Sequence, residues 1–223
     1  MQIIPAILQS DVAKVAEQVA LAATDSELTG VQLDIIDGQL AEQLTVTPYD
    51  LIEVDFGHLK ADFHLMTQDP LDYVWEILAQ KEHLPVRAIV GQVERMSDQA
   101  AFVKAVREQH WQAGLALDVE TPLESIDEDV WEQLDQVLLL AVPMGRQGQS
   151  FDERVYGKLH ELARMRADLR LDIEASVDGG VRPEQMAHLA AHGVGQVCVG
   201  SYVWQAADFG AAMAELREAT EKL

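Results

Sequence analysis

Eight short runs rich in Val, Ile and Leu recur along this chain, and this repetition constrains its fold more than any other feature. The runs cover residues 3–8, 31–36, 61–66, 86–90, 113–117, 137–142, 171–177 and 196–199. Apolar runs of this length are typical of strands that are buried on both faces, as in parallel sheets. They therefore predict eight strands.

Amphipathic stretches separate these runs. Asp11 is the expected N-cap of a helix that continues to about residue 23, because apolar residues follow it at helical spacing. Pro70 and Pro183 are expected to begin helices that end near residues 80 and 192. Two more helices are expected before residues 111 and 171, and the Ala- and Glu-rich tail from residue 206 to 223 is expected to be helical.

Eight strands that alternate with helices predict an α/β protein with a (β/α)8 TIM barrel. Barrels of this size routinely form one domain, so we expect a single domain over residues 1–223. The alternative is a doubly wound open sheet, which favours a glycine-rich phosphate turn after its first strand. Here the first strand is followed by Gln9, Ser10 and Asp11, which favours the barrel.

The charge balance excludes several classes of partner. The 223 residues include 16 Lys and Arg but 38 Asp and Glu, a net charge of −22. Such a chain lacks the basic surface that duplex nucleic acids and anionic lipids require. A single cysteine, Cys198, excludes an internal disulfide and fits a reducing compartment. Without a signal-like start or an apolar run near the roughly 20 residues of a membrane span, we expect a cytoplasmic protein.

Alternation within the strands separates an apolar set that faces the helices from a polar set that faces the barrel centre. The polar set includes Gln32 and Asp34 on the second strand, His64 on the third and Asp178 at the end of the seventh. Barrel enzymes carry their active sites at the carboxyl ends of the strands. Buried carboxylates need a cation, a shared proton or hydrogen-bond donors, so these residues are a candidate divalent-metal site.

Glycine-bearing loops follow the sixth, seventh and eighth predicted strands. Glycine lets backbone N–H groups approach an anion closely, and the loops after strands seven and eight form the recurring phosphate site of barrels. We therefore expect an anion to bind in these loops. The candidate residues are Gly148, Gly179, Gly180, Gly200 and Ser201, with Arg146 beside them.

Eight motifs follow one another along nearly the whole chain. They are PAIL at 5–8, LDIIDG at 33–38, LTVTP at 44–48, DFHLM at 62–66, TPLE at 121–124, GQSF at 148–151, VDGGV at 177–181 and GS at 200–201. No motif is diagnostic alone, but in this order and spacing they resemble the ribulose-phosphate 3-epimerase family. The resemblance implies a barrel of the ribulose-phosphate-binding type.

The resemblance also implies an isomerase of carbohydrate metabolism that inverts the carbon next to the ketone of a small sugar phosphate. Asp34 and Asp178 match the two acids of the family, which act on opposite faces of the reacting carbon. A divalent ion (Mn, Fe, Zn, Co or Mg) held by these acids, His64 and Gln32 would stabilise the developing oxyanion. Met66 matches a residue that lines the substrate site. Relatives form homo-oligomers, which we expect here as well.

Substitutions relative to the family pattern fall within this predicted site. The first metal-binding His of the family matches Gln32, a second His matches Gln92, and the Ser after Pro5 is Ala6. Gln32 could ligate through its amide oxygen and favour harder ions such as Mn²⁺ or Mg²⁺. Alternatively, it could contact the substrate while three residues hold the metal, or the metal could be weakly held or lost.

Two classes of function are therefore open. The first is an epimerase-type enzyme, which the retention of Asp34, His64 and Asp178 favours. The second is a diverged, non-catalytic barrel that binds a phosphorylated ligand or a protein partner at its mouth. The substitutions at Ala6, Gln32 and Gln92 are the reason to keep this alternative.

Overall fold

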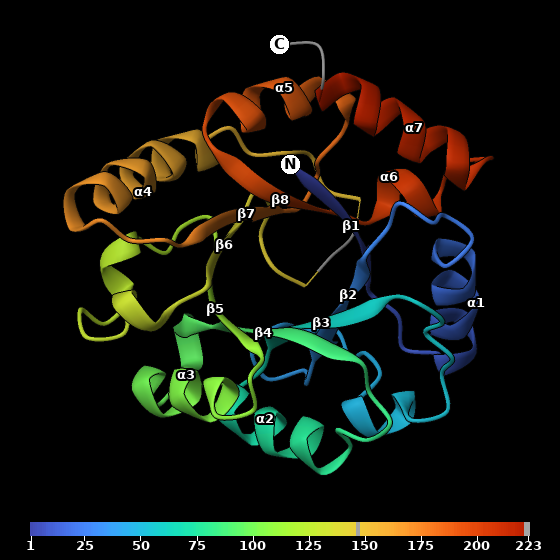
Figure 1. Cartoon of the computed structure of the whole chain (residues 1–223), viewed down its shortest axis with the longest axis horizontal. Coiled ribbons are helices and arrows are strands. Elements are labelled where there is room, and N and C mark those ends of the chain that lie inside the picture. The colour runs from blue at the N-terminus through green and yellow to red at the C-terminus, as the bar shows by residue number, and fades with distance from the viewer. Residues whose placement is uncertain (146–147, 221–223) are drawn as a thin grey trace.

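A computed structural model describes residues 1–145 and 148–220. Within these residues, eight parallel strands close into one barrel in sequence order (Figure 1). They are β1 (Gln2–Ile7), β2 (Gly30–Ile36), β3 (Lys60–Met66), β4 (Val86–Gln92), β5 (Gln112–Leu117), β6 (Gln136–Leu140), β7 (Glu174–Asp178) and β8 (Val194–Val199). Pairing of β1 with β8 closes the ring, which confirms the predicted barrel.

Helices surround the strands in Figure 1. They are α1 (Val12–Ala22), α2 (Pro70–Ala79), α3 (Gln99–Arg107), α4 (Val155–Leu169), α5 (Pro183–Ala191), α6 (Ser201–Trp204) and α7 (Phe209–Thr220). Short 3-10 helices take the place of an α-helix between β2 and β3 and between β5 and β6, and another follows β4. They are η1 (Pro48–Leu51), η2 (Val93–Arg95), η3 (Leu123–Ser125) and η4 (Trp131–Gln133).

The helix starts predicted at Asp11, Pro70 and Pro183 are confirmed, and the structure adds Asp69 and Asp98 as caps. Asp11, Asp69 and Asp98 each accept a hydrogen bond from a backbone N–H in the first turn of α1, α2 and α3. Such a cap satisfies a donor that has no partner within the helix. Pro70 and Pro183 are the first residues of α2 and α5, where the missing N–H of proline is not needed.

Two predicted starts, those of β7 and of the C-terminal helix, are wrong by three residues. β7 begins at Glu174 rather than 171, because Glu174 pairs with Gln136, the first residue of β6, and no strand lies opposite the preceding residues. The tail is not one helix from residue 206, because α7 begins at Phe209. Asp208, the residue before it, caps this helix: its Oδ1 accepts a hydrogen bond from the backbone N–H of Ala211. Residues 221–223 lie outside the described part of the chain.

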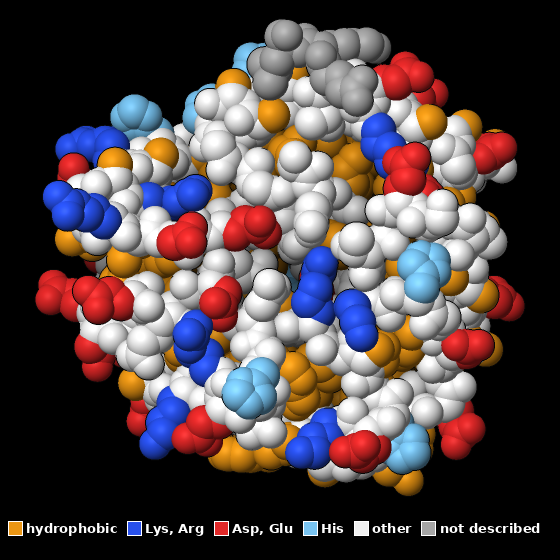
Figure 2. All heavy atoms as spheres, viewed as in Figure 1, with side chains coloured by type: hydrophobic (Ala, Val, Ile, Leu, Met, Phe, Trp, Pro, Cys, Tyr) orange, Lys and Arg blue, Asp and Glu red, His pale blue; other side chains and the backbone are white. Residues whose placement is uncertain are grey.

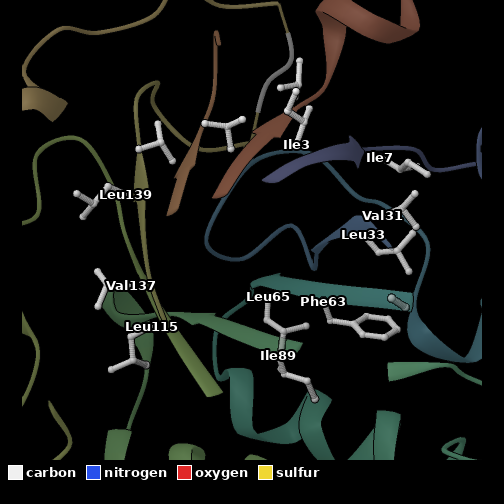
Figure 3. Packing of buried hydrophobic residues seen from close by; sticks show 14 of the residues in the cluster. Ile3, Ile7, Val31, Leu33, Phe63, Leu65, Ile89, Leu115, Val137 and Leu139 are labelled. Atoms are coloured by element: carbon white, nitrogen blue, oxygen red, sulfur yellow. The ribbon is translucent and has the colours of Figure 1, made fainter. Parts of the chain in front are cut away.

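Alternate strand residues form two apolar layers. In Figure 3, Val31, Leu33 and Phe63 are among the labelled side chains on the outer side of the barrel, where they pack against helices. A smaller cluster fills the inside, consisting of Ile4, Ala6, Val90, Ala116, Leu138 and Cys198. The predicted alternation in the second and third strands is therefore confirmed.

The surface carries charges of both signs. On the face shown in Figure 2, Lys and Arg side chains lie among Asp and Glu side chains rather than apart from them. The described residues of that face therefore offer no continuous basic area to a nucleic-acid backbone. Within residues 1–145 and 148–220, no helix is both long enough and apolar enough to cross a bilayer.

Candidate active site

Strands β2, β3 and β7 bring Asp34, His64 and Asp178 together at their carboxyl ends. Asp34 lies opposite His64 in the register of β2 and β3, and Asp178 is the last residue of β7. One potential ligand atom from each side chain lies within 4.8 Å of the others. The three side chains are 8%, 1% and 13% exposed, respectively, so the cluster is largely shielded from water.

Gln32 lies between the two acids. Its Nε2 donates to Asp34 Oδ1 at 2.9 Å and to Asp178 Oδ2 at 2.6 Å. Its Oε1 accepts a hydrogen bond from Cys198 Sγ at 2.9 Å. The amide thus presents its nitrogen to the acids, and in this orientation Gln32 is a hydrogen-bond donor to the cluster rather than a metal ligand.

His64 faces both carboxylates through one ring nitrogen. Its Nδ1 lies 3.1 Å from Asp34 Oδ1 and 3.8 Å from Asp178 Oδ2. Burial lowers the pKa of His64, but the hydrogen bond and charge of Asp34, with help from Asp178, outweigh it and raise the pKa overall. An imidazolium at this position would balance one of the two negative charges.

The donor set of the cluster fits a divalent cation. Asp34 and Asp178 supply carboxylate oxygens and His64 supplies an imidazole nitrogen, which are ligands that Zn²⁺, Mn²⁺ and related ions accept. Three protein ligands leave coordination positions open for substrate oxygens. These three residues could therefore hold a metal, whereas Gln32 would first have to turn its amide.

Asp178 has an unusual affinity for protons. Burial raises the pKa of Asp178 to about 7, and the negative charge of Asp34 adds to the rise. The charge of His64 and the hydrogen bond from Gln32 act in the opposite direction. A carboxyl group with such a pKa can hold a proton near neutral pH and release it, as general acid–base catalysis requires.

We expect Asp178→Asn to raise the stability of the metal-free protein at pH 8 but not at pH 4. The pKa of Asp178 rises from 3.8 to about 7 on folding, so between these values the native state binds more protons than the unfolded state. The contribution of this group to stability is therefore lost as the pH rises through that window. Thermal melting in EDTA at the two pH values measures the difference in stability between the variant and the wild type. An equal difference at both pH values would contradict the raised pKa of Asp178.

One cavity contains both the acids and the glycine loops. The empty space between its lining residues is about 560 Å³ when the part that is open to solvent is counted. The predicted residues that line it are Asp34, His64, Met66, Gly148, Asp178, Gly179, Gly180, Gly200 and Ser201. Arg146, predicted to lie beside the anion, is outside the described residues.

The loop after β7 has a backbone that requires glycine. Gly179 has a φ of +104° and Gly180 a φ of +66°. A Cβ on Gly180 would lie 2.5 Å from the backbone nitrogen of Phe151, and one on Gly179 would lie 2.4 Å from a methyl group of Val142. Without side chains here, the backbone can come close to a ligand.

We expect Gly180→Ala to weaken the binding of a phosphorylated ligand by about 10- to 100-fold, because the loop must shift and its N–H groups would then be misplaced for the anion that this loop is predicted to bind. Calorimetric titration with a sugar phosphate measures this loss. Gly157→Ala is the matched control, since Gly157 lies in α4 with open space around its missing Cβ. Equal affinities in the two variants would contradict the role of the loop.

The cavity has further lining residues besides the candidate residues named above. They are Leu8, Leu140, Val142, Met144, Gly145, Gln149, Val181 and Tyr202, together with Ala6, which was noted only as a substitution. Tyr202 could have been predicted as a lining residue, because it directly follows the candidate residues Gly200 and Ser201. Gln92, by contrast, does not line the cavity. With its amide oriented so that the nitrogen faces acceptors, Gln92 donates to Glu94 Oε2 at 3.1 Å and to the Ala116 carbonyl at 2.7 Å.

Comparisons with known proteins point to one family. The sequence model of the ribulose-phosphate 3 epimerase family matches residues 2–204. The ribulose-phosphate 3-epimerase of Escherichia coli strain K12 is 30% identical over 99% of this chain and 96% of that protein. The enzyme of the same name from Bacillus subtilis strain 168 is also 30% identical, over 97% and 98%. The crystal structure of 3-hexulose-6-phosphate synthase from Salmonella typhimurium shares the fold, with a TM-score of 0.69 and 13% identity over 100% of this chain and 99% of that chain.

Proposed function

Because the chain belongs to the ribulose-phosphate 3 epimerase family, we propose that it inverts the carbon next to the ketone of a small sugar phosphate. The observation that carries this proposal is the convergence of Asp34 and Asp178 on one cavity that the glycine loops also line. The two acids come from β2 and β7, which β1 and β8 separate in the ring. Ribulose phosphate is the first candidate substrate, since the relatives are named for it.

The reaction is a proton transfer between two acids and one carbon. The carboxylate of Asp34 accepts the proton from the carbon next to the ketone, and the electron pair of the C–H bond moves toward the carbonyl oxygen. The carboxyl group of Asp178 then delivers its proton to the opposite face of that carbon, which inverts the centre. In the reverse direction the two acids exchange roles, and the raised pKa of Asp178 suits a group that must hold a proton at neutral pH.

The developing negative charge needs donors nearby. The NH₂ group of Gln32 and the ring of His64 lie beside both acids and are buried, so they act in a poorly solvated environment where such interactions are strong. A divalent ion bound by Asp34, Asp178 and the neutral imidazole of His64 would supply electrostatic stabilisation of the oxyanion in place of a protonated His64.

The phosphate group would bind the glycine loops. A chain with a net charge of −22 has no general attraction for an anion, so the donors must be local. The loops after β7 and β8 bring the backbone of Gly179, Gly180 and Gly200 and the side chain of Ser201 to the cavity. The N–H group of Gly179 donates to the carboxylate of Asp178, so the N–H groups of the other residues would hold the anion. We therefore assign the phosphate to these residues, with Gly148 on the facing loop.

Deuterium exchange tests the proposed function. Ribulose 5-phosphate is incubated with the protein in D₂O, with Mn²⁺, Fe²⁺, Co²⁺, Zn²⁺ or Mg²⁺ supplied in separate samples, and a hexulose phosphate is treated in parallel. We expect inversion at the carbon beside the ketone with incorporation of one solvent deuterium there. Thermal stabilisation by sugar phosphates without exchange would refute the enzyme and support the non-catalytic binding barrel instead.

A further inference from the structure

Hydrogen bonds run through the inside of the barrel from the strand starts toward the two acids. Arg87, in the first half of β4, donates from Nη2 to Gln196 Oε1 at 3.3 Å. Gln196 Nε2 lies 3.8 Å from Cys198 Sγ and donates to it. Cys198 Sγ in turn donates to Gln32 Oε1 at 2.9 Å. The series ends at the NH₂ group of Gln32, which donates to the carboxylates of Asp34 and Asp178.

Each link in this series has a direction that the previous link imposes. A guanidinium only donates, so Gln196 must accept through its oxygen and turn its nitrogen toward the sulfur. The sulfur lone pair accepts that hydrogen bond, which leaves the thiol proton for the oxygen of Gln32. Gln32 then has only its nitrogen for the acids, and carboxylates only accept.

Burial makes this order hard to reverse. Gln196, Cys198 and Gln32 are 4%, 1% and 2% exposed. Burial also raises the pKa of the Cys198 thiol well above its ordinary value, so the thiol keeps the proton that it donates. Turning the amide of Gln32 would direct its N–H groups at the thiol and its oxygen at the carboxylates, which leaves buried polar groups without good partners.

We propose that Gln196 and Cys198 are positioning residues that hold the NH₂ group of Gln32 against Asp34 and Asp178, where it competes with a divalent cation for the carboxylate oxygens. The proposal deepens the proposed function, because it concerns the same two acids. A cation that uses those oxygens must displace the N–H groups or turn the amide against Cys198. The Asp34, His64 and Asp178 cluster should therefore bind a divalent ion more weakly than it would with the amide released.

Two substitutions that differ by one hydroxyl group test the proposal. Cys198→Ser keeps a donor to Gln32 Oε1, whereas Cys198→Ala removes it. Mn²⁺ binding to the metal-free proteins is measured by calorimetric titration. We expect Cys198→Ser to match the wild type and Cys198→Ala to bind Mn²⁺ about three- to tenfold more tightly, the effect of one typical hydrogen bond. No gain in Cys198→Ala, including no detectable binding in either variant, would overturn the proposal.

The wild-type protein provides an independent measurement that needs no substitution. Cys198 is the single cysteine of the chain, so the infrared S–H stretching band reports its hydrogen bond alone. We expect a band lowered in frequency in the metal-free protein and a shift to higher frequency when Mn²⁺ saturates the site. A band at the frequency of a free thiol before metal is added would overturn the proposal. Neither measurement requires turnover, so failure of the proposed function would appear separately, as absent deuterium exchange.

Discussion

Asp34→Asn and Asp178→Asn should each lower kcat for inversion of the sugar phosphate by about a thousandfold, the usual contribution of a positioned acid or base. Asparagine has nearly the same shape as aspartate but neither accepts nor donates the transferred proton at neutral pH. The barrel should fold in both variants, because the amide can still pair with Gln32. NMR observation of the epimeric sugar phosphates over time measures the rate, and circular dichroism checks the fold.

Asp118→Asn is the matched control for this loss. Asp118 directly follows β5 at the same end of the barrel, but it does not line the cavity. Its Oδ1 accepts a hydrogen bond from the N–H of Val119 at 2.8 Å, and the oxygen of asparagine can do the same. We expect kcat to be essentially unchanged in this variant. An Asp34 or Asp178 variant as active as the control would show that the carboxylates are not the proton carriers.

Arg87→Met should lower the free energy of unfolding by about 3–5 kcal/mol, because it leaves a buried carboxylate without its cation. Arg87 Nε donates to Asp62 Oδ1 at 2.8 Å, and Nη2 donates to the other oxygen of Asp62. The Asp62 side chain is only 3% exposed. Burial raises the pKa of Asp62, and Arg87 offsets part of that rise. Urea denaturation at pH 7 measures the loss.

Lys104→Met controls for the removal of a positive charge at the surface. Lys104 lies on α3 and pairs with Glu108, which directly follows that helix, and the two side chains are 74% and 57% exposed. Because water screens such a pair, its loss should change the free energy of unfolding by no more than about 1 kcal/mol. Equal losses in the Arg87 and Lys104 variants would mean that the buried pair has no special role in stability.

The sequence predicts the barrel well because each strand carries its own signal. In β2, Val31 and Leu33 pack outward while Gln32 and Asp34 face the centre. The alternation of apolar and polar residues in the sequence is enough to predict these directions, because side chains of a strand alternate between its two faces. The start of β7 is different, since it depends on where β6 begins, at Gln136. A strand boundary set by a partner elsewhere in the chain leaves no local trace in the sequence.

The members of the candidate site are predictable from strand ends, but their orientation is not. Gln32 faces the acids with its nitrogen because Cys198, 166 residues later, donates to its oxygen. The apolar run 197–199 predicts that Cys198 is a buried core thiol, and this is confirmed. That pattern does not indicate what the thiol touches, because the contact arises only when β8 closes against β1 and brings its inward side chains beside those of β2.

The most direct test of the central claim, that each acid serves one face of the reacting carbon, is deuterium exchange into each epimer by the single-acid variants. The two epimers of the sugar phosphate are incubated separately in D₂O with Asp34→Asn and with Asp178→Asn. We predict that each variant exchanges the proton beside the ketone in one epimer without inverting it, and that the two variants act on opposite epimers. Exchange of the same epimer by both variants, or of both epimers by either one, would contradict the account.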